Sequence, residues 1–126
     1  MWGGNNGSPV FDWIAHHASR RPRQTAVIDL GTDRRLTYQE FDDRIGRLAW
    51  HLRREFAVSF GDRVAVLAQN TTDTLEVQFA CGRLGAIFVP LNCRLNYVEL
   101  RTIIADCSPA VLFQGCSTLY TSEGRC

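Results

Sequence analysis

Lysine is absent from the 126 residues, so all fourteen basic side chains are arginine. Reactions that need a lysine ammonium, such as Schiff-base formation or the grip of a phosphate-loop lysine on a nucleotide, are therefore excluded for this chain alone. The five cysteines stand far apart, with no Cys-x-x-Cys pair and no Cys/His cluster of the zinc type. We expect no metal site from these residues.

Excess charge of one sign and long apolar runs are also lacking. The formal net charge is +1 at pH 7, too small for the overall field to predict binding to nucleic acid or to an anionic membrane. No apolar run approaches the roughly eighteen residues of a membrane span. The opening Met1–Gly7 has neither the basic nor the apolar region of a secretory signal. We therefore expect a cytoplasmic protein whose cysteines stay reduced.

The N-terminal residues predict a tail and a short helix. Residues 1–9 are rich in Gly and Asn and are expected to form a flexible tail. Its last two residues, Ser8 and Pro9, have the pattern of an N-cap followed by the first helical residue. The helix predicted from there ends before Pro22, because the residue preceding a proline disfavours helical geometry.

A hairpin and a long helix are predicted next. The apolar and β-branched stretch Thr25–Leu30 is followed by a Gly-Thr-Asp turn and a second short extended segment, 35–37, which together predict a β-hairpin. Thr37 and Glu40 have the spacing of a capping box. Apolar residues then recur at steps of three and four as far as Phe56, which predicts an amphipathic helix.

The second half alternates buried strands with helices. Short apolar runs between capped helices predict parallel strands, and short connections predict right-handed crossovers. The fold class is α/β, a partial doubly wound parallel sheet with flanking helices. Residues 10–113 are expected to form part of a domain, because two and a half crossovers do not complete one, and residues 114–126 an irregular tail. The predicted order is strand 63–68, a helix capped near Asn70 that ends at Gly85, strand 86–89 stopped by Pro90, a helix from Asn96 to Cys107, and strand 110–113.

Four sequence segments occur in an order and spacing that together point to one family. They are Leu36–Phe41, Gly61–Leu67, Asn70 and Leu84–Asn92. These segments resemble the start of acyl-CoA synthetases and of their relatives among the AMP-binding, adenylate-forming enzymes. The resemblance runs from about residue 10 to residue 113 and implies an N-terminal subdomain fragment of the adenylate-forming fold.

This resemblance implies a ligase of fatty acid metabolism. Such enzymes use ATP to turn a carboxylic acid into an acyl-adenylate with release of pyrophosphate, and the coenzyme A thiol then displaces AMP. The family does this with a phosphate-binding loop, an acidic magnesium site and a lysine in a small C-terminal domain. Because none of the three is found in this sequence, we expect ATP, Mg²⁺ and coenzyme A to bind the full-length family and this fragment to be inactive, with no catalytic or cofactor-binding residue of its own.

One segment shares three residues with the phosphate-binding loop of the family. Residues Tyr120–Gly124 begin Tyr-Thr-Ser, as that loop does, but the next residue is Glu123. A carboxylate has the wrong sign for a loop that must wrap phosphate. The segment is therefore interpreted as an unrelated tail, with a rearranged piece of the loop as the alternative.

The carboxyl ends of the predicted parallel strands indicate where a ligand would bind. In open parallel sheets the ligand crevice lies beyond these ends. Asn92 and Arg94 follow the second strand there and are the candidates to face a substrate. The alternative interpretation is structural, with Asn92 holding a turn through its side chain.

Two functions of different classes remain open. The chain is either the scaffold of a ligase whose reaction it cannot finish, or a noncatalytic protein derived from such an enzyme that binds a partner through an exposed sheet edge. A complete nucleotide-binding protein of another family is disfavoured, because no Gly-x-Gly-x-x-Gly and no Walker loop is found.

Overall fold

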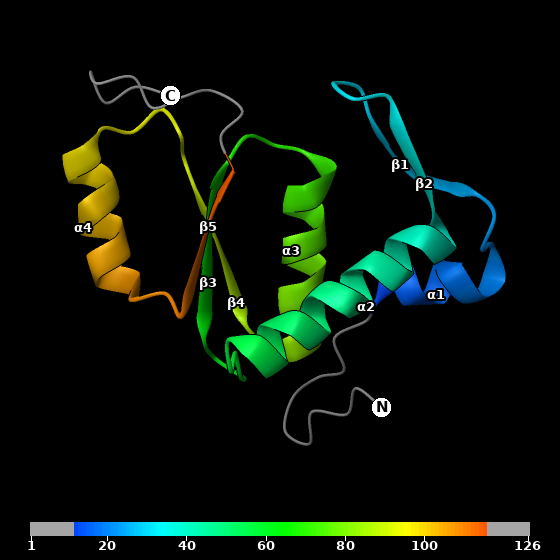
Figure 1. The fold of residues 1–126 in the computed structure, drawn as a ribbon, viewed down its shortest axis with the longest axis horizontal. Coiled ribbons are helices and arrows are strands. Elements are labelled where there is room, and N and C mark those ends of the chain that lie inside the picture. The colour runs from blue at the N-terminus through cyan, green and yellow to red at the C-terminus, as the bar shows by residue number, and fades with distance from the viewer. Residues whose placement is uncertain (1–11, 116–126) are drawn as a thin grey trace.

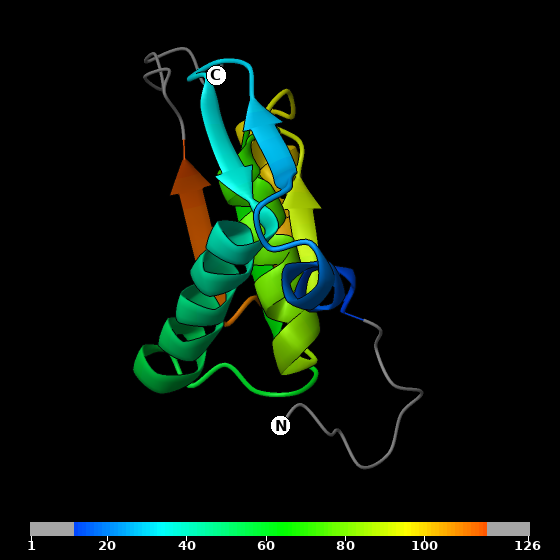
Figure 2. The same cartoon turned by 90° about the vertical axis from the view of Figure 1, so that its right-hand side faces the viewer.

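The computed structural model describes residues 12–115, which form three layers (Figure 1). A parallel sheet lies between α4 on one face and α2 with α3 on the other, while α1 and a hairpin lie at the end opposite α4. Figure 2 looks onto the hairpin end. The elements are α1 Trp13–Arg20, β1 Thr25–Asp29, β2 Arg34–Thr37, α2 Tyr38–Glu55, β3 Arg63–Ala68, α3 Thr72–Leu84, β4 Ile87–Leu91, α4 Tyr97–Cys107 and β5 Val111–Gly115.

The sheet has the predicted parallel arrangement. Its order is β4-β3-β5, and β3 pairs in parallel with both neighbours. Alternate side chains of β3 enter two separate clusters, because successive residues of a strand point to opposite faces. Val64 and Val66 pack with α2 and α3, whereas Ala65 and Leu67 pack under α4. The prediction that this strand is covered on both faces is confirmed.

Helix α2 contributes more buried residues to the larger core than any other described element. Its side chains Phe41, Ile45 and Leu52 are buried at the helical spacing that the sequence predicts. The predicted capping box opens the helix: the Glu40 N–H donates to Thr37 Oγ1 at 3.2 Å and the Thr37 N–H donates to Glu40 Oε2 at 2.8 Å. These bonds satisfy amides that a helix start otherwise leaves unpaired.

The first helix begins later than the sequence predicts. Asp12 is its N-cap and accepts a hydrogen bond from the Ala15 N–H at 3.0 Å, so the predicted start at Ser8 and Pro9 is wrong. Asp and Ser are comparable N-caps, and Asp12 lies nearer to Ile14, the buried residue of this helix. Ser8 and Pro9 themselves lie outside the described residues.

A single buried arginine joins three helices. The side chain of Arg83, on α3, is only 7% exposed. Its Nε donates to Asp12 Oδ2 at 2.7 Å, and its Nη2 contacts the carboxylate of Asp42 on α2. Because a buried guanidinium is costly without partners, these two carboxylates fix α1 and α2 against α3.

Two predicted strand ends are wrong. Strand β4 continues through Pro90 to Leu91. It tolerates a proline because it is an edge strand. An edge strand has a neighbour on one side only, so the N–H that proline lacks is not needed for a hydrogen bond to a second strand. Strand β5 includes Gln114 and Gly115, two residues of the predicted irregular tail. The rest of that tail, 116–126, lies outside the described residues.

Helix α3 shows one further difference from the sequence prediction. Its N-cap is Thr71 instead of Asn70, and the left-handed Gly85 ends it as predicted. Within residues 12–115, no helix combines the length and the apolar character needed to cross a membrane.

Candidate functional site

The carboxyl ends of β3 and β5 and the first turns of α3 enclose a depression of about 400 Å³. Parallel strands end there together, which is where open α/β sheets bind ligands. The start of α3 closes the side opposite β5. The residues that line the depression are Val66, Ala68, Gln69, Thr71, Asp73, Thr74, Val77, Phe113, Gln114 and Gly115.

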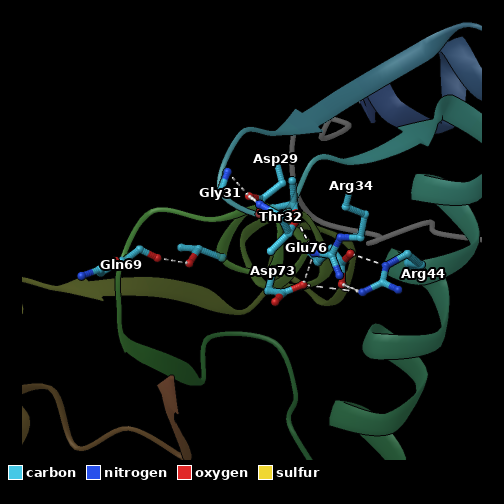
Figure 3. Close-up of polar contacts among 10 residues, drawn as sticks. Asp29, Gly31, Thr32, Arg34, Arg44, Gln69, Asp73 and Glu76 are labelled. Atoms are coloured by element: carbon cyan, nitrogen blue, oxygen red, sulfur yellow. Dashed lines mark hydrogen bonds and ion pairs between the residues drawn. The ribbon is translucent and has the colours of Figure 1, made fainter. Parts of the chain in front are cut away.

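The wall of this depression is held by a hydrogen bond across the β3–α3 connection. The Thr74 hydroxyl donates to the backbone carbonyl of Gln69 at 3.0 Å, and Figure 3 shows this contact beside the polar cluster. Thr71, the N-cap, makes no side-chain cap bond. The corner between strand and helix is therefore fixed by Thr74 inside the first turn and not by its N-cap.

A polar network joins the start of α3 to the hairpin and to α2 (Figure 3). Arg34 Nη2 lies 2.6 Å from Asp73 Oδ1 and also contacts the hydroxyl of Thr72. Arg44 Nη2 lies 3.2 Å from Glu76 Oε2 and 3.6 Å from Asp73 Oδ1. Glu76 is buried, and a buried carboxylate requires such a partner. Its hydrogen bond with Arg44 is the main cause that raises the pKa of that arginine above its ordinary value.

The hairpin turn carries the last carboxylate of this network. Asp29 Oδ1 accepts from the N–H groups of Gly31 at 3.0 Å and of Thr32 at 3.2 Å, and its other oxygen accepts from the Thr72 hydroxyl at 3.4 Å. The backbone hydrogen bond from Thr32 is the largest cause that lowers the pKa of Asp29 below 3.8. Asp29 is thus held ionised.

These contacts make the network a structural one. Asp73 and Glu76 each face an arginine, and Asp29 is ionised at any ordinary pH. The cluster therefore orients the hairpin and α2 on α3.

The two residues predicted to face a substrate lie elsewhere on the same edge. Asn92 and Arg94 follow β4, are exposed and do not line the depression. Asn92 Oδ1 accepts from the Arg94 N–H at 2.9 Å. This hydrogen bond holds a turn, as the alternative, structural interpretation of Asn92 predicts. A contact of Arg94 with substrate stays a prediction.

The sequence interpretation did not include the residues that line the depression among its candidates to face a substrate. It assigned Gln114 to the irregular tail. The rule that strand ends meet at one edge would have found Gln114, had the third strand been extended by two residues.

The depression offers no cationic side chain to a nucleoside triphosphate with magnesium, the ligand that the resemblance implies. No arginine side chain lines it, and the carboxylate of Asp73 stands at its wall. Phosphates bind to cations or free amides, and the first turn of α3 contributes backbone amides there without a cation beside them. Among the described residues there is also no group of three His, Cys, Asp or Glu side chains able to hold a metal ion.

Comparison with known proteins identifies the relatives of the chain. A family model described as AMP-binding enzyme matches residues 14–124. The chain is 41% identical over 104 residues to the indoleacetate–CoA ligase of Aromatoleum aromaticum, an alignment of 82% of this chain and 20% of that protein. It is 47% identical over 100 residues to a feruloyl-CoA synthase of Amycolatopsis, with 79% and 20% covered.

Solved structures give the same result. The fatty acyl CoA synthetase of Mycobacterium tuberculosis superposes with a TM-score of 0.77 at 30% identity, covering 82% of this chain and 20% of that chain. The o-succinylbenzoate coenzyme A synthetase of Bacillus subtilis, solved with ATP and a magnesium ion, gives 0.76 at 28% identity, with 86% and 29% covered. The chain thus spans about a fifth of the length of these curated relatives, and it belongs to the AMP-binding enzyme family of acyl-CoA ligases.

Proposed function

We propose that this chain supplies the N-terminal scaffold of an ATP-dependent acid–CoA ligase and cannot complete the reaction by itself. The family match over residues 14–124 carries this proposal. In the proposed reaction a carboxylate oxygen attacks the α-phosphorus of ATP and pyrophosphate leaves. The coenzyme A sulfur then attacks the acyl carbon and AMP leaves.

The residues of this chain would support that reaction indirectly. The sheet and α3 position the carboxyl ends of the parallel strands. The arginine network holds the hairpin and α2 against α3. ATP, Mg²⁺ and coenzyme A would be bound by parts of a ligase that this sequence does not encode, because the chain has no lysine and its described depression has no cationic side chain.

A fatty acid is the substrate that the resemblance to acyl-CoA synthetases suggests. Support comes from the 30% identity to the long-chain-fatty-acid–CoA ligase FadD13 of Mycobacterium tuberculosis. An aryl acid is the second candidate, favoured by the higher identities, 41% and 47%, to ligases named for indoleacetate and ferulate.

A noncatalytic role in binding a partner is the other candidate function. Strand β5 pairs only with β3 among the described strands, so its second edge is open. Open edges present unpaired backbone groups that can accept another strand. A protein that binds its partner through this strand edge would need no nucleotide site.

A chimera tests the scaffold proposal. The segment of the Amycolatopsis feruloyl-CoA synthase that aligns with this chain would be replaced by the matching residues of this chain. If the segment is scaffold, the chimera should form feruloyl-CoA with kcat/KM within about tenfold of the parent enzyme. A soluble, folded chimera with no thioester formation would contradict the scaffold proposal and favour partner binding.

The same chimera tests the predicted substrate contact. Replacing Arg94 by alanine should raise the KM for the acid by about tenfold with kcat little changed, as expected for the loss of uniform substrate binding. Arg101→Ala, an exposed arginine on α4, is the matched control. Equal kinetics for both variants would show that Arg94 does not contact the substrate.

A further inference from the structure

The outer side of α4 is exposed and hollowed. This helix is the outermost layer of the described structure, and in Figure 1 no other described element lies beyond it. Tyr97 and Val98 are 64% and 70% exposed, while Leu100 on the opposite side is buried against the sheet. Exposed apolar side chains gathered on one face suit a contact with another protein surface. The outer side has a hollow of about 400 Å³, lined by Tyr97, Val98, Arg101, Thr102 and Ala105.

A small molecule is not the ligand that this hollow fits. All five lining residues come from one helix, so a small ligand would be covered on one side only. Sites for small molecules enclose most of the ligand surface. A second helix lying along the hollow would contact all five residues, over a length of roughly 16 Å for the eleven residues of α4.

The residues of this side have the spacing of a helix pair. Val98, Thr102 and Ala105 stand at steps of four and three, which are the d, a and d positions of a heptad repeat. All three side chains are exposed. Leu100 and Ile104, which pack on the sheet, then take the f and c positions, which face away from a partner helix. The same helix can therefore pack on the sheet and on a second helix at once.

The charged side chains of α4 lie on the two flanks of this seam. Arg101 is the g residue on one flank, and Asp106 is the e residue on the other, five positions later. In a parallel helix pair, a g residue lies beside the e residue five positions further along the partner. Arg101 of each copy would therefore face Asp106 of the other. Glu99, the second e residue, also accepts from the Asn96 N–H at 3.0 Å in the capping box.

An antiparallel pair would bring like charges together. Reversing one helix places g beside g and e beside e, so Arg101 would approach Arg101 of the other copy. Asp106 would approach Glu99 of the other copy in the same arrangement. Like charges side by side destabilise helix contacts. Because α4 has two carboxylates and one arginine, it also offers no attraction to a polyanion such as nucleic acid.

We propose that α4 pairs in parallel with α4 of a second copy of this chain, about a two-fold axis that runs between the two helices. A two-fold axis makes such an interface self-complementary, because each copy presents the same residues. The contact between Arg101 and Asp106 then forms twice. One pair of short helices buries less area than a standard interface, so we expect a weak dimer with a Kd on the order of 100 μM. The inference goes beyond the proposed ligase function and does not depend on it.

Analytical ultracentrifugation of the full chain tests whether this dimer exists. The weight-average mass should rise from the monomer value of 14.2 kDa toward twice that value between about 10 μM and about 1 mM. A mass that stays at the monomer value, or that grows beyond the dimer, would overturn the proposal. Kinetic assays at nanomolar enzyme lie far below this Kd, so Arg101→Ala stays a valid control for the substrate contact predicted for Arg94.

A charge exchange tests the seam. Asp106→Arg should raise the Kd by at least about tenfold, because arginines then face one another across the dimer. Adding Arg101→Asp should bring the Kd back to within about threefold of the parent chain, because opposite charges face one another again. Arg53→Asp, at an exposed position of α2, is the matched control and should leave the Kd unchanged. A double variant as weak as Asp106→Arg alone, or an equal loss in the control, would contradict the proposed seam.

Two cysteine variants report the orientation. In the parallel pair, position 98 lies beside position 98 of the other copy, so Val98→Cys should form a disulfide between copies under mild oxidation. Arg101→Cys should form none, because the two positions 101 lie on opposite flanks. Peptide mass spectrometry distinguishes these disulfides from those of the native cysteines, and circular dichroism should show every variant folded. A disulfide in Arg101→Cys and none in Val98→Cys would indicate an antiparallel pair and overturn the proposal.

Discussion

Gly85 shows how one residue can fix a helix end. It has a φ of +69°, and a Cβ placed there would lie 2.4 Å from Cδ2 of Phe60. Alanine at this position must adopt a left-handed conformation and displace the ring. We expect Gly85→Ala to lower the free energy of unfolding by about 2 kcal/mol, measured by urea denaturation.

The neighbouring Gly82 provides the matched control. It lies inside α3, and nothing stands within 4 Å of a Cβ built there. Because glycine is a poor residue for a helix interior, Gly82→Ala should stabilise the chain by about 0.5 to 1 kcal/mol. If both substitutions changed stability in the same direction, the left-handed turn would not be the cause.

Cys81 should react more slowly than the other cysteines of the described chain. Burial raises the pKa of its thiol to about 11, and only the thiolate attacks alkylating reagents. At about pH 8, iodoacetamide should label Cys93 and Cys107, which are half-buried, at least about tenfold faster than Cys81, as read by peptide mass spectrometry. Labelling of Cys81 at the same rate would mean that α3 opens readily.

At the scale of elements, the hairpin should respond to acid through Asp29. Its lowered pKa means that the carboxylate is favoured in the folded state. The stabilisation is therefore complete above the unfolded value near 3.8 and is lost as the pH falls through the lower folded value. The urea midpoints of the parent chain and of Asp29→Asn should differ at about pH 6, and the difference should shrink as the pH falls below 3.8.

Asp33→Asn on the same turn is the matched control for this measurement. Asp33 is exposed and faces Arg35 at 3.7 Å, a surface pair of little energetic weight. The Asp33→Asn substitution changes the formal charge by the same amount as Asp29→Asn. Because the Asp33 pair is weak, we expect a smaller shift of the urea midpoint than for Asp29→Asn. A gap between the parent chain and Asp29→Asn that persists unchanged at low pH would show that the hydrogen bonds of Asp29 do not depend on its charge.

The elements also show which structure can be predicted from sequence. Helix α2, its capping box, strand β3 and the cap at Asn96 follow from local patterns, because each is set by residues within a few positions. The ends of β4 and β5 do not. Pro90 fits in β4 because this strand lies at an edge of the sheet, and β5 is longer than predicted because Gln114 pairs with Leu67. Both strand ends therefore depend on pairing with a strand distant in the sequence.

The candidate site was predicted less well than the fold. The carboxyl edge of the sheet follows from topology, and Asn92 and Arg94 were correctly placed there. The depression between β5 and α3 was not predicted, because it requires the position of Phe113 relative to α3. The contacts of Arg34 and Arg44 with α3 join residues more than thirty positions apart, and local spacing gives no signal for them.

At the scale of the whole molecule, the described residues form a layered α/β structure that leaves apolar side chains of its end strands exposed. The sheet is covered on both faces, but both of its end strands are partly exposed, with Leu112 of β5 43% and Ile87 of β4 48% exposed. Its relatives are about four times as long, because the 104 and 100 aligned residues are 20% of each. These features suit a part of a ligase whose nucleotide site is built from other segments.

Titration of the purified, folded 126-residue chain with ATP and magnesium by isothermal calorimetry tests this conclusion most directly. The Bacillus subtilis o-succinylbenzoate coenzyme A synthetase, solved with both, is the positive control. A scaffold without a nucleotide site predicts no saturable heat at ATP concentrations up to about 1 mM. Saturable binding by the folded chain would contradict it and would place a nucleotide site within these residues.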